Sequence, residues 1–206
     1  MTSNPEVLGA ISRATQRPGM HPRSDIREPN WRFWELRNIN MHRVVGLATE
    51  DRQFTGASDL GREIRMVLQR NFKRAWWRGI AYGVVVELSA VSLAADDLKM
   101  LVDVRENEKG DLQWVVLVSS DARTVLGVHT WIEGLLSPVY RDVLQALAAG
   151  GYHVASVKRE KDGLLKFLTA VADVDVAIQS LGTRKKLFSD FREPDLAGEN
   201  SATERS

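Results

Sequence analysis

The stretch ASDLGREIRMVLQRNFKRAWWRGIAYGVVVEL, residues 57–88, contains the two patterns that decide the fold. Its first part predicts a helix over residues 59–77, with Ser58 or Asp59 as the N-cap and Gly79 just beyond the end. Residues 80–88 alternate and are rich in β-branched side chains, which predicts a strand. The helix prediction depends on an apolar stripe at helical spacing, formed by Leu60, Ile64, Val67, Leu68, Phe72 and Ala75.

Further strands are expected on both sides of this stretch. The polar residues 106–111 include a glycine and predict a hairpin, which would make residues 98–105 and 112–119 antiparallel neighbours. Residues 31–48, which precede the helix, are ambiguous, and a strand near residues 42–48 is favoured over a short helix. The predicted strands outside residues 57–88 are residues 42–48, 98–105, 112–119 and 152–157.

Three more helical segments are predicted in the second half of the chain. Asp121 is a suitable N-cap for a helix that runs to Leu136. Pro138 fits the first turn of the next helix, which ends near Ala149 before two glycines. Residues 162–181 form the last helical region.

The order of these elements predicts an α+β fold, in which a mainly antiparallel sheet is covered by helices. A three-layer α/β fold is the alternative if residues 94–104 are helical. Residues 1–30 show no sustained period and contain four prolines, so we expect a flexible basic tail there. A single α+β domain would then occupy residues 31–188, followed by a second flexible tail over residues 189–206.

The composition is that of an ordinary globular protein, with 44% hydrophobic and 27% charged residues. The chain has no cysteine, which excludes disulfides, thiolate metal ligands and a cysteine nucleophile. Its longest apolar runs, residues 79–88 and 112–119, are much shorter than the roughly 20 residues of a membrane-spanning helix. Since no secretory signal is visible either, we expect a cytoplasmic protein without membrane contact.

Charge is distributed unevenly along the chain although the formal net charge is only +1. Residues 1–78 carry a balance of +6, whereas residues 79–206 carry −5. A basic N-terminal part indicates an acidic partner, such as a nucleic-acid backbone, or association between the two parts in neighbouring copies.

The sequence contains no recognised signature of a catalytic, nucleotide-binding or cofactor-binding site. His129 and Glu133 have the spacing of two helical ligands, but a catalytic zinc usually takes three ligands from the protein. Residues 119–121 could receive an anion at a helix start, although capping by Asp121 is the favoured interpretation. We therefore expect no catalytic residue, no metal and no cofactor.

The exposed face of the predicted helix at residues 59–77 is the candidate binding surface. Guanidinium groups bind phosphate bidentately and an indole can stack on a base, so this mixture of side chains indicates nucleic acid. The candidate nucleic-acid-binding residues are Arg62, Arg65, Arg70, Lys73, Arg74, Trp77 and Arg78.

We therefore predict a non-enzymatic regulatory or accessory protein that binds DNA or RNA and forms a homo-oligomer. The alternative is a protein-interaction or assembly subunit whose basic part binds an acidic protein surface. A small-ligand enzyme with a site near residues 119–121 ranks third. A continuous positive face on the structure would favour nucleic acid, whereas a mixed apolar groove would favour a protein partner.

Overall fold

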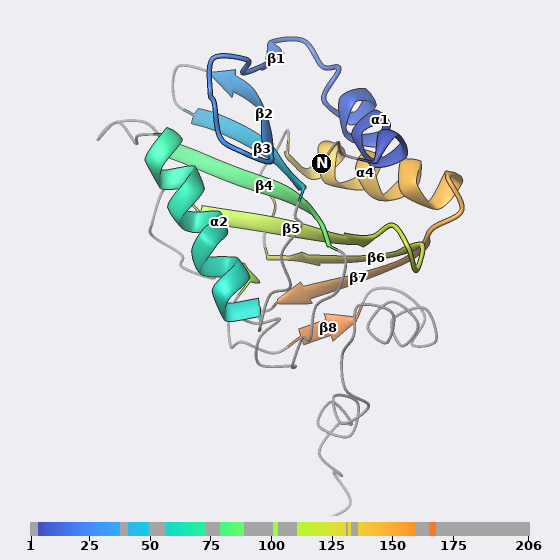
Figure 1. Ribbon diagram of the computed structural model, residues 1–206. Coiled ribbons are helices and arrows are strands. Elements are labelled where there is room, and N and C mark those ends of the chain that lie inside the picture. The colour runs from blue at the N-terminus through green and yellow to red at the C-terminus, as the bar shows by residue number, and fades with distance from the viewer. Residues whose placement is uncertain are drawn as a thin grey trace, which may run out of the picture.

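An eight-stranded sheet forms the centre of the computed structural model, which describes residues 4–37, 41–49, 57–72, 79–88, 101–102, 111–130, 132, 136–159 and 165–167. The strands occur in the sheet in chain order (Figure 1). Their bounds are β1 Met20–Pro22, β2 Trp31–Arg37, β3 Met41–Thr49, β4 Gly79–Glu87, β5 Asp111–Ser119, β6 Thr124–His129, β7 His153–Arg159 and β8 Leu165–Phe167. The helices with described bounds are α1 Pro5–Ala14, α2 Ala57–Asn71 and α4 Leu136–Ala149. No helix in these ranges is long and apolar enough to span a membrane.

The strands of the sheet run in both directions. Antiparallel pairs are formed by β1 with β2, β2 with β3, β5 with β6, and β7 with β8. Parallel pairs are formed by β3 with β4, β4 with β5, and β6 with β7. Antiparallel pairs are in a slight majority, and the predicted α+β class is confirmed.

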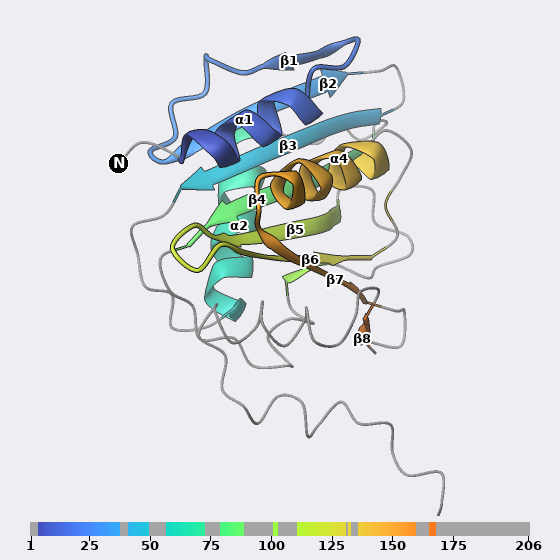
Figure 2. The same ribbon diagram turned by 90° about the vertical axis from the view of Figure 1, so that its right-hand side faces the viewer.

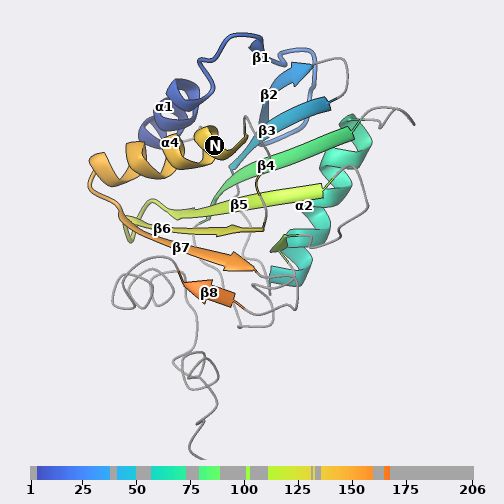
Figure 3. The same cartoon turned by 180° about the vertical axis from the view of Figure 1, so that it is seen from behind.

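Helices lie on both faces of the sheet because the strand direction reverses between β5 and β6. A crossover between parallel strands is right-handed in nearly all proteins, so strand direction decides which face its helix covers. β3 and β4 point one way and α2 connects them, whereas β6 and β7 point the other way and α4 connects them. Figure 1 and Figure 3 accordingly show α2 on one side of the sheet and α1 with α4 on the other.

Each face of the sheet carries its own hydrophobic core. The first core lies under α2 and contains Leu60, Ile64, Val67, Leu68 and Phe72, which confirms the predicted stripe over the described part of that helix. Ala75, the last residue predicted for it, lies outside the described residues. The second core lies under α1 and α4 and also includes alternate side chains of β4, β5 and β6.

The prediction of a hairpin between residues 98–105 and 112–119 is wrong. A strand has two edges, and those of β5 are taken by β4 and β6. Most of residues 98–105 lie outside the described residues, but Leu101 and Val102 are buried in the first core beside α2. The connection from β4 to β5 is therefore a parallel crossover.

The helix predicted from Asp121 to Leu136 is also wrong where the structure describes it, because residues 124–129 form β6. Residues 120–123 make a tight turn, in which Arg123 adopts a left-handed backbone with φ of 49°. The β-branched and apolar residues that follow this turn pair at once with β5 in an antiparallel arrangement. The next helix begins only at Leu136 and ends at Ala149 as predicted. The helical region predicted over residues 162–181 is wrong where the structure describes it, because Leu165–Phe167 form β8 and pair with β7.

The first thirty residues contain α1, so the prediction of a flexible tail over residues 1–30 is wrong for the part described. Pro5 stands in the first turn of the helix, where its missing N–H is not needed, and the Asn4 side chain accepts from the Glu6 amide at 2.9 Å. α1 packs beside α4 on the sheet (Figure 2). Its buried side chains recur at helical spacing and are Val7, Ala10, Ile11 and Ala14. Residues 189–206 lie outside the described residues.

Two glycines in the second core let aromatic rings lie directly on the sheet. A Cβ at Gly83 would come within 2.0 Å of the Trp114 ring on the neighbouring strand. At Gly127 a Cβ would come within 2.3 Å of the Tyr140 hydroxyl, which lies 2.7 Å from Ser156 Oγ. Burial raises the pKa of the Tyr140 hydroxyl.

Gly83→Ala should destabilise the protein by about 3 kcal/mol, because Trp114 is fully buried and cannot move aside without disturbing the core. Gly9→Ala is the matched control, since the nearest atom to its Cβ would be the mobile end of Arg13 at 3.7 Å. It should stabilise α1 by about 0.5 to 1 kcal/mol. Chemical denaturation of both variants measures the difference, and equal midpoints would contradict this packing.

Candidate functional site

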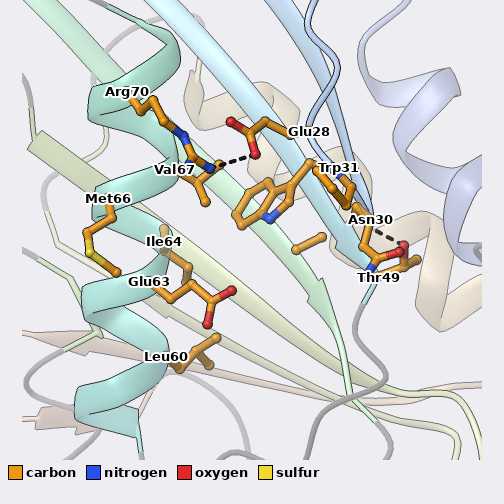
Figure 4. A pocket seen from close by; sticks show the side chains of 12 residues that line it. Glu28, Asn30, Trp31, Thr49, Leu60, Glu63, Ile64, Met66, Val67 and Arg70 are labelled. Carbon is orange, nitrogen blue, oxygen red and sulfur yellow. Dashed lines mark hydrogen bonds and ion pairs between the residues drawn. The ribbon is translucent and has the colours of Figure 1, made fainter.

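A half-open cavity of about 440 Å³ lies between α2 and the neighbouring ends of β2 and β3 (Figure 4). We call this cavity the α2 groove. Its volume falls within the range of roughly 300 to 1,000 Å³ that is usual for ligand sites. It is lined by Glu28, Pro29, Asn30, Trp31, Ala48, Thr49, Leu60, Glu63, Ile64, Met66, Val67 and Arg70.

A tight turn before β2 forms one wall of the α2 groove. Asn30 has a left-handed backbone with φ of 63°, a conformation that asparagine tolerates better than most residues. Its carbonyl accepts from the Thr49 amide at 2.8 Å and from the Thr49 hydroxyl at 3.1 Å, which ties the turn to the end of β3. The Trp31 amide donates to the Glu28 carbonyl at 3.2 Å and closes the turn.

Glu28 clamps this wall to α2. Its carboxylate accepts from the Arg70 guanidinium at 2.6 Å and from the Asn71 side-chain amide at 2.7 Å. The Glu28 side chain is only 12% exposed, whereas that of Arg70 is 65% exposed. The negative charge of Glu28 is therefore compensated inside the wall. Arg70 forms its ion pair with a carboxylate of the same chain.

The floor of the α2 groove is apolar and aromatic. Leu60, Ile64 and Val67 of α2 are buried there against the sheet. The Trp31 ring stacks on Phe33, with centroids 5.5 Å apart and planes 13° apart, and its edge lies 3.1 Å from where a Gly46 Cβ would be. These contacts fix the orientation of the indole, which lines the groove while half-buried.

Met66 and Glu63 contribute side chains from α2 to the rim. Met66 is 57% exposed, and among the described residues it is the one large hydrophobic side chain that lies mostly in solvent. Glu63 is half-buried and makes no hydrogen bond or ion pair with any residue that the structure describes. Figure 4 shows its carboxylate extending from the helix into the groove, between Leu60 and Trp31. Within the described part of the chain, the groove thus combines an apolar floor with one carboxylate that has no ion-pair partner.

The candidate nucleic-acid-binding residues divide between described and undescribed positions. Arg62 is 70% exposed and pairs with Asp59 at 2.6 Å on the same helix. Arg65 is half-buried and interacts with another residue of the chain. Arg70 forms an ion pair with Glu28. Lys73, Arg74, Trp77 and Arg78 lie outside the described residues. The nucleic-acid interface stays a prediction, and its described arginines already have protein partners.

A second group of charged side chains lies on the same face of the sheet, beyond the C-terminal end of α2. Glu35 is 5% exposed and contacts Arg23, Arg37 and His42, which surround its carboxylate. Arg23 also donates twice to Asp25 at 2.7 Å, and these hydrogen bonds hold the pKa of the Asp25 carboxyl at about 2. Arg23 follows β1 and Glu35 lies in β2, so their ion pair joins the segment after β1 to the sheet.

The other positions singled out in the sequence have local structural partners. His129 Nδ1 lies 2.7 Å from the Thr130 carbonyl, and Glu133 lies outside the described residues. Ser120 donates to Glu87 at 2.7 Å, and the Ala122 amide donates to Ser119 Oγ at 3.4 Å. These serines close the turn between β5 and β6, so no helix follows that Asp121 could cap. Within the described ranges, no three His, Asp or Glu side chains are grouped as metal ligands.

No protein-family model matches the chain, and no curated protein or solved structure is significantly similar to it. The α2 groove is accordingly interpreted from its own chemistry.

Arg70→Glu should release the turn before β2, because it places a second carboxylate beside Glu28 in a poorly exposed site. Hydrogen exchange followed by mass spectrometry should then show faster exchange in residues 28–31. Arg62→Glu is the matched control, since within the described residues Arg62 pairs only with Asp59 on the same helix. Equal exchange in the two variants would mean that the Glu28 clamp does not hold the wall of the groove.

Proposed function

We propose that this protein is a protein-interaction subunit that receives a side chain of a partner protein in the α2 groove. The observation that carries the proposal is that Trp31, Met66 and Arg70 line one groove with an apolar floor. Tryptophan, methionine and arginine are among the residue types enriched at protein interfaces. A groove with both apolar and charged walls is the kind of surface that favours a protein partner over nucleic acid.

The shape of the groove supports binding of an inserted side chain. Its floor is preformed by packed residues, so little conformational entropy is lost when a partner binds. Met66 presents a flexible thioether chain to solvent at the rim, where an incoming side chain could cover it. Central pockets that bury an anchor residue supply most of the binding energy at protein interfaces.

The charge on α2 favours this proposal over the nucleic-acid prediction. An arginine that already pairs with a carboxylate of its own chain must give up that contact to bind a phosphate, which reduces the free energy gained on binding. Arg62 and Arg70 are both paired with carboxylates of this chain, at 2.6 Å in each case. DNA or RNA binding by the remaining basic residues, and assembly into a homo-oligomer, stay predictions.

A library of random linear peptides displayed on phage tests the proposal. Peptides selected on the wild-type protein should bind Met66→Ser about tenfold more weakly, equivalent to about 1.4 kcal/mol, because the apolar rim contact is lost. Gln69→Ser is the matched control: Gln69 is an exposed residue of α2 that does not line the groove. Failure to select any peptide, or equal binding by both variants, would refute the proposal.

A further inference from the structure

The Glu63 carboxylate lines the α2 groove and has no ion-pair partner among the described residues. It is half-buried, extends toward the cavity and has no hydrogen-bond or ion-pair contact in the described part of the chain (Figure 4). Glu28, the other carboxylate of the lining, is compensated by Arg70 and Asn71. A carboxylate that is partly removed from water attracts a positively charged group.

The Trp31 ring is a second feature that favours a cation. Tryptophan is the aromatic side chain that attracts cations most strongly, because its ring carries negative charge density on its faces. Phe33 packs against the ring and holds it in place, and the ring lines the same hollow as Glu63. In Figure 4 the Glu63 carboxylate and the indole both lie on the groove side of the helix, and both residues line the groove.

Arg70 does not oppose a cation at this end of the groove. Glu63 and Arg70 are seven residues apart on α2, which places them about 10 Å apart along the helix axis. That separation exceeds the screening length of about 8 Å at physiological salt. Arg70 is also engaged by Glu28 at 2.6 Å, so its charge is largely compensated.

We infer that the partner inserts a cationic side chain into the α2 groove, arginine in preference to lysine. The inference depends on the proposed protein-interaction function and specifies the anchor residue. The planar guanidinium can stack on Trp31 while it donates two parallel hydrogen bonds to Glu63, which the ammonium group of lysine cannot do. The aliphatic part of the arginine side chain would then lie against Leu60 and Met66. The inserted side chain is positively charged, whereas the basic N-terminal part alone suggests a negatively charged partner.

The test uses the phage-selected peptides and synthetic copies in which each arginine is replaced by citrulline, its neutral isostere. Selected peptides should contain a shared arginine, and its replacement should weaken binding to the wild-type protein about tenfold or more. Glu63→Gln should weaken binding of the arginine peptide to a similar extent and bind the citrulline peptide as the wild type does. Glu6→Gln is the control, because it removes the same charge from α1 on the other face of the sheet.

The outcomes separate this inference from the proposed function. Peptides that depend on Met66 but tolerate citrulline and Glu63→Gln would overturn the cationic anchor and leave the protein-interaction function standing. Peptides anchored by a neutral, acidic or lysine side chain would overturn it as well. Sedimentation of the purified protein tests another occupant, since self-association that Glu63→Gln abolishes would assign the groove to a second copy of this chain and overturn a separate partner.

Discussion

The right-handed crossover is the constraint on which the rest of the structure depends. Since β3, β4 and β5 share one direction and β6 and β7 the opposite one, helices must cover both faces of one sheet. The central strands are then buried on both sides, which explains why eight of the nine residues of β4 are buried. A strand with one wet face would instead alternate. The continuous apolar run in the sequence is thus a result of the reversal between β5 and β6.

Those parts of the fold whose signal lies within a single element could be predicted from the sequence. The apolar stripe of α2 and the apolar run of β4 are examples, and the α+β class follows from their order. The errors arose where a short signal has two meanings. Pro5 breaks a helix interior but fits a first turn, and Asp121 can cap a helix or stand in a hairpin turn. Only the pairing of β5 with both neighbours decides between the two meanings of Asp121.

The α2 groove could not be predicted because its walls come from separate segments. Helical periodicity correctly places Arg70 off the buried stripe of α2, but it contains no information about Glu28, which lies 42 residues earlier. The half-buried position of Trp31 depends on Phe33 and on the absence of a side chain at Gly46. Glu63 is an ordinary helix-surface residue until β2 and β3 enclose it. Tertiary contacts therefore create this site from residues that are unremarkable in sequence.

The contact between α1 and α4 has a consequence for synthesis on the ribosome. The four buried side chains of α1 share their core with α4, which is translated ~120 residues later. At a translation rate of roughly 5 to 20 residues per second, α4 is made about 6 to 24 s after α1. During that interval a ten-residue helix is only marginally stable in water, so its apolar side chains are open to chaperones or to other nascent chains. α2 and β4 are adjacent in the chain and can begin to form the first core during translation. Both cores are nevertheless completed late, because Ala155 and Val157 of β7 belong to the first core and α4 belongs to the second.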